Sequence, residues 1–256
     1  MHFTATADTD VGISKKNNQD SVLIKHASYA GGEVLLAIIC DGMGGLSKGE
    51  LASASVIKTF SRWFDEELPY ELENVDFQII GGKWSLMLKT LNKHILEVSP
   101  RYCQSGESMG TTFTGILFIN DGYVIAHVGD TRVYQIKSEM KQLTEDQTFV
   151  AREIRRGTMT EEQARQDRRR NMLLQCIGAS NTVEPQIITG RTEKGAYMLC
   201  SDGFRHVISE QEMYESLNPV NLMNPQAMHS NAKYLIEQVK SRREKDNISV
   251  ILIKAE

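Results

Sequence analysis

Residues 33–45 read Glu33-Val-Leu-Leu-Ala-Ile-Ile-Cys-Asp-Gly-Met-Gly-Gly45. The run up to Cys40 is short, continuous and apolar, which is typical of a β-strand covered on both of its faces. It stops at Asp41, and the glycine-rich segment that follows predicts a tight turn. This stretch therefore predicts a strand inside a layered domain, with an acidic residue at the point where the strand ends.

Helices are predicted on the C-terminal side of this turn. The first runs from Ser47, its expected N-cap, to about Glu67. Apolar residues recur along it at Leu51, Ala54, Ile57 and Phe64. A second helix is predicted over about residues 79–98, and further helices near 209–217 and 225–240. The polar stretch of about 147–170, rich in both charges, is also predicted to be helical.

The middle and the end of the chain favour strands. Residues 111–119 and 123–128 flank Asn120-Asp121-Gly122, which predicts a β-hairpin, and a third strand covers 132–136. Residues 196–200 and 248–253 are two more apolar strands. Strands and helices thus come in blocks, and hairpins join several strands. This pattern favours an α+β domain of antiparallel sheets with helices packed outside them.

Composition limits the classes of function. The chain has 256 residues, enough for one large domain or at most two small ones, and its formal net charge of −4 argues against nucleic acid as the main ligand. No apolar run is long enough to span a bilayer, and the start at Met1 lacks the features of a signal peptide. We therefore expect a cytoplasmic protein without a membrane contact, whose four scattered cysteines are reduced.

Acidic residues recur where apolar strands end or begin. They are Asp41, Asp130, Asp202 and Asp246, each beside Gly or Asn, and Asp20 precedes a further apolar run. A single Asp at such a place is ordinarily a turn former. Carboxylates at the ends of several strands of one core would converge, however, and would repel one another unless cations lay between them. All-oxygen ligands point to Mg²⁺ or Mn²⁺, and a pair of such ions predicts hydrolysis of a phosphate ester.

The order of short motifs resembles the PPM family of metal-dependent protein serine/threonine phosphatases (2C-like), in its short bacterial form. The resemblance covers nearly the whole chain. The motifs are Asp10-Val-Gly12 through Asn18-Gln-Asp20, Asp41-Gly-Met-Gly-Gly45 with Gly49-Glu-Leu-Ala52, Met109-Gly-Thr-Thr112, Val128-Gly-Asp-Thr-Arg132, Leu143-Thr-Glu-Asp146, Asn171 to Gly178, Leu199-Cys-Ser-Asp-Gly203 and Asp246-Asn-Ile-Ser249. Each is weak alone, but eight in this order are strong evidence.

The resemblance implies an architecture and a set of metal ligands. The expected fold is a single domain over 1–256, an antiparallel β-sandwich flanked by helices on both outer faces, with a flap at about 147–170 beside the active site. Asp41 is implied to bridge two ions, with Gly42 offering its carbonyl to one and Asp202 and Asp246 completing the other. Two further carboxylates are implied in supporting positions, Asp130 at a third, weaker ion and Asp20 on metal-bound waters.

Four positions depart from the family pattern. Gln19 stands where the family usually has Glu, so it would ligate or hold a metal water with less charge. Lys15 stands at a position that is often Arg, and it keeps the charge for substrate phosphate but loses the bidentate fork. Met43 stands where some relatives carry a His that is proposed as a general acid, and Gln175 replaces the usual Arg of its motif. His127, on an apolar strand, is expected to be a core histidine and not a ligand.

The implied activity is hydrolysis of phosphoserine and phosphothreonine in proteins by a metal-activated bridging water, with Asp41, Asp20 and Lys15 as the catalytic set and Mn²⁺ or Mg²⁺ as cofactor. The expected partners are phosphorylated proteins and a cognate serine/threonine kinase, and we expect a monomer. Two other classes remain open. They are a metal-dependent hydrolase of small phosphate esters and a non-catalytic binding module of the same fold.

Overall fold

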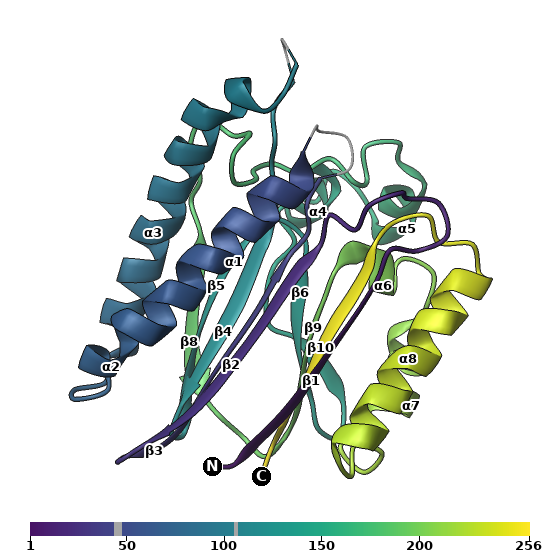
Figure 1. Ribbon diagram of the computed structural model, residues 1–256. Coiled ribbons are helices and arrows are strands. Elements are labelled where there is room, and N and C mark those ends of the chain that lie inside the picture. The colour runs from purple at the N-terminus through teal and green to yellow at the C-terminus, as the bar shows by residue number, and fades with distance from the viewer. Residues whose placement is uncertain (44–47, 105–106) are drawn as a thin grey trace.

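The strands form two five-stranded antiparallel sheets in a computed structural model that describes residues 1–43, 48–104 and 107–256 (Figure 1). One sheet has the order β1 (Phe3–Asp10), β10 (Ile248–Ala255), β9 (Gly195–Cys200), β6 (Arg132–Ile136) and β7 (Met140–Gln142). The other has the order β2 (Ser21–Tyr29), β3 (Gly32–Cys40), β4 (Phe113–Ile119), β5 (Gly122–Val128) and β8 (Gln186–Arg191). Both termini lie together at one end of the sandwich.

The apolar run before Asp41 forms β3, which is buried on both faces, as its sequence predicted. Alternate residues of a strand point to opposite faces of the sheet. Leu35, Ala37 and Ile39 lie in the core between the two sheets, which also contains Phe118 and Tyr197. The remaining residues of the run face outward and pack under helices. The residue after Cys40 is therefore carried by one of the most firmly packed strands of the molecule.

Helices cover both outer faces. α1 (Gly49–Glu66) and α3 (Phe77–Val98) lie on the sheet that contains β3, where Phe60, Trp63 and Trp84 are buried in one cluster. α7 (Glu210–Leu217) and α8 (Pro225–Ser241) lie on the other sheet, over β9 and β10. Figure 1 shows the four layers edge-on. The prediction of an α+β fold with an antiparallel sandwich between two helical layers is confirmed.

The buried face of α1 differs from the predicted one. Leu51 is 41% exposed and Ala54 is exposed as well. The face toward the sheet is formed by Ala52, Val56, Phe60, Trp63 and Phe64, so of the four predicted apolar positions only Phe64 belongs to it fully. The aromatic residues decide this orientation because they bury the largest apolar surface. The expected N-cap, Ser47, lies outside the described residues.

The stretch of 147–170 contains two short helices and not one long one. They are α4 (Phe149–Arg155) and α5 (Glu161–Gln166). Gly157, with φ of +71°, lies in the turn between them, and Thr160 caps the second helix through a capping box. A left-handed glycine is a common end of a helix, and it interrupts the periodicity that the polar sequence suggested. The predicted second helix, over 79–98, is confirmed as α3, which Asp76 caps.

Candidate metal centre

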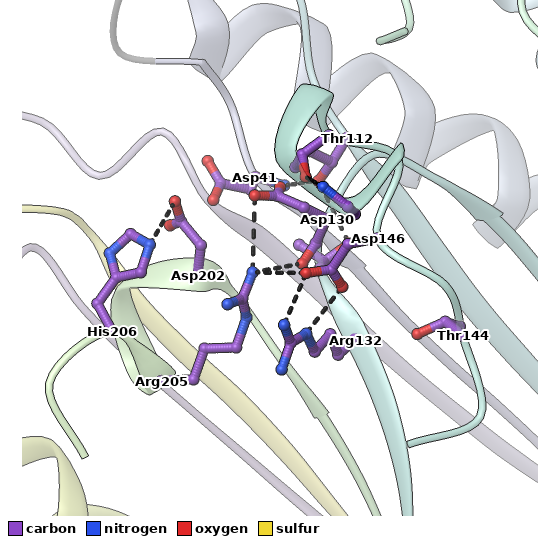
Figure 2. Close-up of polar contacts among 12 residues, drawn as sticks. Asp41, Thr112, Asp130, Arg132, Thr144, Asp146, Asp202, Arg205 and His206 are labelled. Carbon is purple, nitrogen blue, oxygen red and sulfur yellow. Dashed lines mark hydrogen bonds and ion pairs between the residues drawn. The ribbon is translucent and has the colours of Figure 1, made fainter. Parts of the chain in front are cut away.

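Strand ends bring the predicted acidic residues together at one end of the sandwich. Asp41 directly follows β3, while Asp202 is the first residue of a short helix, α6 (Asp202–Arg205), that follows β9. Asp130 lies just after β5, and Asp246 lies two residues before β10. Figure 2 shows Asp41, Asp130 and Asp202 near one another. The predicted convergence of these residues is therefore present in the structure.

The crowding shows in the acidity of the carboxyl groups. Burial raises the pKa of Asp41 well above its usual range, and the neighbouring carboxylates of Asp20 and Asp202 raise it further. Burial also raises the pKa of Asp20 to about 7, although a hydrogen bond from Ser249 offsets part of the effect. Two or more charges this close in a buried site are stable only if cations or protons accompany them.

Unpartnered oxygens identify where a cation would fit. Oδ1 of Asp20 and Oδ1 of Asp202 are buried, and neither makes a hydrogen bond. A buried carboxylate oxygen without a donor is costly, and a hard divalent ion is the partner that such oxygen-only sites prefer. The chemistry of these residues therefore fits Mg²⁺ or Mn²⁺.

The carboxylates are close together but are not arranged as a complete set of metal ligands. Among the residues that the structure describes, no group of three or more His, Cys, Asp or Glu side chains is arranged to hold a metal ion. Basic side chains contact two of the acids instead. Lys15 Nζ lies 2.9 Å from Asp246 Oδ1, and His206 Nε2 lies 3.3 Å from Asp202 Oδ2. An ion bound to these carboxylates would compete with both contacts.

Asp41 is fastened by the Met109-Gly-Thr-Thr112 segment. Its backbone N–H donates to Thr112 Oγ1 at 2.9 Å, and its carbonyl accepts from the Thr112 N–H at 2.8 Å and from Thr111 Oγ1 at 2.9 Å. These bonds continue the pairing of β3 with β4 beyond the end of the strand. The two threonines therefore set the direction in which the Asp41 carboxylate leaves the backbone.

Gly42 lies where three segments meet. A Cβ atom at this position would come within 2.4 Å of the Gln19 carbonyl oxygen and 2.7 Å of the Gly49 carbonyl oxygen. No side chain fits in that space, which is the physical reason for glycine here. Gln19 itself is engaged, since its Nε2 donates to Glu50 Oε2 at 3.1 Å. The amide at position 19 is therefore held by the start of α1.

The segment that carries Lys15, Gln19 and Asp20 is held by residues just before and within β10. Asn247 accepts a hydrogen bond from the Gln19 backbone N–H at 2.9 Å, and Ser249 Oγ donates to Asp20 Oδ2 at 2.6 Å. In the Asp246-Asn-Ile-Ser249 motif, Asp246 is therefore a potential ligand, while Asn247 and Ser249 hold Gln19 and Asp20 beside it.

Sequence reasoning missed a buried charge network beside Asp130. Arg132 donates two hydrogen bonds to Asp146, from Nε to Oδ1 at 2.8 Å and from Nη2 to Oδ2 at 2.6 Å. A second arginine, Arg205, reaches the same place from α6 (Figure 2). The motifs contained Arg132 and Asp146, but no spacing in the sequence indicated that they pair, and nothing marked Arg205 at all.

Two other predicted positions have structural roles. His127 is fully buried, with its Nδ1 2.8 Å from Thr114 Oγ1 and its Nε2 3.0 Å from the Glu145 carbonyl oxygen, which confirms it as a core histidine. Gln175 bridges Gln147 and Glu184, donating to the Gln147 side chain at 2.8 Å and accepting from the Glu184 N–H at 2.7 Å. A neutral amide suits this position because it must donate and accept at once.

Comparison with known proteins agrees with this geometry. Residues 13–243 match the protein phosphatase 2C family model. The chain belongs to the protein phosphatase 2C family. Among curated proteins it is 31% identical over 249 residues to the serine/threonine protein phosphatase PstP of Mycobacterium tuberculosis, with 96% of this chain covered. The match spans 44% of the length of that relative.

Solved structures of the family superpose on nearly all of the chain. The serine/threonine phosphatase of S. agalactiae has a TM-score of 0.85 with 28% identity, and the superposition covers 100% of both chains. The PstP catalytic domain in complex with two manganese ions has a TM-score of 0.76 with 29% identity, covering 98% of this chain and 97% of that one. In the part of the chain that the structure describes, no helix has the length and apolar character that crossing a membrane would require.

Proposed function

We propose that this chain hydrolyses phosphoserine and phosphothreonine in proteins at a centre of two divalent ions. The observation that supports it most is the crowding of buried carboxylates around Asp41, with unpartnered oxygens on Asp20 and Asp202, in a chain of the protein phosphatase 2C family. Such a cluster has an obvious use only when cations bind in it, and paired divalent ions are suited to phosphate esters. The named phosphatases that superpose on the chain support the same reaction.

The proposed ligands are those that the family resemblance implies. Asp41 is proposed to bridge the two ions, with the Gly42 carbonyl on one and Asp202 and Asp246 on the other. Mn²⁺ or Mg²⁺ held there would activate a water molecule and neutralise the charge of the phosphate. The manganese ions of the PstP catalytic domain favour Mn²⁺ as the first ion to test.

The remaining residues are proposed to handle substrate and water. Lys15, which pairs with Asp246 in the structure, is proposed to bind phosphate oxygens as a point charge once an ion occupies Asp246. The unpartnered Oδ1 of Asp20 is proposed to accept a hydrogen bond from the attacking water, and Gln19 is proposed to support a water through its amide oxygen, since its Nε2 donates to Glu50. Met43 has no proton to donate, so the leaving alkoxide takes its proton from water.

The surroundings of the centre suggest its partners. The segment 147–170, with α4 and α5, is proposed as a flap that shapes access for phosphorylated proteins. A cognate serine/threonine kinase, a cytoplasmic location and a monomeric state complete the proposal, together with a single domain over residues 1–256. The PstP relative supports a protein substrate, since it is named a protein phosphatase.

A side-by-side assay tests the function. The purified chain is given a phosphothreonine peptide, p-nitrophenyl phosphate and a nucleotide, each with Mn²⁺ and each with excess chelator. We expect Mn²⁺-dependent turnover in which the phosphopeptide has the highest kcat/KM. A preference for the small ester or the nucleotide would favour a small-molecule hydrolase, and the absence of turnover with tight Mn²⁺ binding would favour a binding module.

A further inference from the structure

Arg205 is a buried cation that lies beside two acidic residues, and this position suggests a function for it. Its side chain is 13% exposed, and its Nη2 lies 3.6 Å from Asp130 Oδ2 and 3.6 Å from Asp146 Oδ2. The same nitrogen donates to the Asp130 backbone carbonyl at 3.0 Å. Figure 2 shows the guanidinium reaching from α6 into the space below Asp130. It thus contacts both the backbone and the carboxylate of Asp130.

Arg205 is available to pair with Asp130 because Asp146 already pairs with Arg132. Arg132 binds Asp146 through two parallel hydrogen bonds, the strongest arrangement available to a carboxylate. Glu210, 4.0 Å from Arg132, and Asp202 are further acids beside these two ion pairs. Arg205 therefore supplies Asp130 with a positive charge from within the protein, although burial and the Asp202 carboxylate still raise the pKa of Asp130 to about 7.

The hydrogen bonding of Arg205 is incomplete. Its Nε is buried and makes no hydrogen bond. A guanidinium whose N–H groups are not all hydrogen-bonded stays in its position because of neighbouring negative charge and because its aliphatic stem is packed. Asp146 and Asp130 both supply this charge, each with a carboxylate oxygen 3.6 Å from Nη2. The side chain of Asp130 is 9% exposed, so without Arg205 it would be a buried anion with no cation beside it.

We propose that Arg205 is the resident counter-cation of Asp130 and that it opposes the binding of a third divalent ion there. The inference rests on the proposed two-ion centre, to which Asp130 was expected to add a weaker third site. A divalent ion on the Asp130 carboxylate would lie next to the guanidinium, and the two positive charges would repel each other in a poorly solvated place. Arg205 thereby keeps the centre at two ions and keeps Asp130 in position without metal.

Calorimetric titration of the metal-free protein with Mn²⁺ tests the competition. We expect two ions in the wild type, and in Arg205→Gln a third ion that binds at least ~10-fold more tightly than any third ion of the wild type. Arg205→Lys should behave as the wild type, and Arg205→Gln combined with Asp130→Asn should lose the gain. Arg191→Gln, at an exposed ion pair with Asp121, is the matched control. An unchanged third-site affinity in Arg205→Gln would overturn the proposal.

Thermal melting of the metal-free variants tests the pairing independently of any ion. Arg205→Gln should lower the Tm, and adding Asp130→Asn should restore at least half of the loss, because it removes the uncompensated charge. If the double variant melts no higher than Arg205→Gln, Arg205 is not the counter-cation of Asp130. If the wild type binds no Mn²⁺ at all, the proposed function fails, while the melting comparison still decides the pairing.

Discussion

Asn247 Oδ1 accepts a hydrogen bond from the backbone N–H of Gln19 at 2.9 Å, across 228 residues of sequence. The same side chain donates to the carbonyl oxygens of Val11 at 3.0 Å and Asn17 at 3.2 Å. One amide thus holds both ends of the loop between β1 and β2. This loop carries Lys15 and ends at Asp20, so Asn247 positions groups that it does not touch.

Replacing Asn247 with alanine should harm activity more than its cost in stability explains. Three hydrogen bonds of a buried amide disappear, and we expect a loss of about 2–3 kcal/mol in the free energy of unfolding. The freed loop should also lower kcat/KM for a phosphopeptide by about 10-fold or more, since small displacements of catalytic groups are costly. Urea unfolding and steady-state kinetics measure the two effects.

Asn231→Ala is the control for that variant. Asn231 also donates to two backbone carbonyls, those of Ser216 at 3.0 Å and Asn221 at 3.2 Å, but it lies on α8 away from the acidic residues. It should lose stability and keep its activity per folded molecule. Equal kinetic losses in the two variants would show that Asn247 has no special role in positioning the loop.

Gly203→Ala should displace the helix that carries Asp202. A Cβ atom at this position would come 2.1 Å from the Asn247 carbonyl oxygen, a distance at which α6 and the segment before β10 must separate. We expect a loss of about 1–3 kcal/mol in stability, with weaker Mn²⁺ binding. Gly82→Ala in α3 is the matched control, because nothing lies within 4 Å of the added atom there.

Gly82→Ala should even be more stable than the wild type. Alanine is a better helix former than glycine by about 0.5–1 kcal/mol in a helix interior. Circular dichroism melts and calorimetric Mn²⁺ titrations separate the two variants. Mn²⁺ affinity that is equal in Gly203→Ala and the wild type would contradict the view that close packing of α6 positions Asp202.

His127 should make the protein less stable in mild acid. Burial lowers the pKa of this histidine from 6.5 to about 4. The unfolded chain therefore binds a proton in a pH range where the folded chain does not, and stability falls as the pH drops from about 6.5 toward 4. From these two pKa values the contribution of His127 to the free energy of unfolding should decrease by about 2 kcal/mol between pH 7 and pH 5, while the raised pKa values of Asp20 and Asp130 act in the opposite direction.

His127→Gln isolates this contribution. Glutamine retains a donor and an acceptor for Glu145 and Thr114 but does not titrate. Between pH 7 and pH 5, the change in the free energy of unfolding should differ between this variant and the wild type by about 2 kcal/mol, within a factor of two. His94→Gln, at an exposed position of α3, is the control. A wild type and a His127→Gln variant with identical pH profiles would exclude the buried, neutral histidine.

The central strands and the acidic residues at their ends were predictable, because a continuous apolar run has one simple explanation. β1 was not predicted, since its sequence Phe-Thr-Ala-Thr-Ala-Asp-Thr-Asp is largely polar. It forms as an edge strand, where pairing with β10 along eight residues compensates for a weak apolar pattern. β8 was missed for the same reason, as the polar edge of the other sheet.

The side chains that support the acidic residues were less predictable than the acids themselves. Arg205 follows Asp202 by three residues, and its partner Asp130 is distant in the sequence, so only the folded chain brings them together. The face of α1 was misjudged because its first half offers mainly small residues on the buried side, and the aromatic residues of its second half determined which face packs inward. Tertiary packing decided both cases, and local patterns could not reveal it.

Asp41→Asn tests the central claim, that a buried carboxylate cluster binds the ions of a phosphatase. The measurement is the rate of phosphothreonine peptide hydrolysis at saturating Mn²⁺, with Asp121→Asn in the exposed β4–β5 turn as the control. We expect Asp41→Asn to lose at least ~10²-fold in rate, while Asp121→Asn turns over as fast as the wild type. Full activity of Asp41→Asn, or hydrolysis by the wild type that persists in excess chelator, would contradict it.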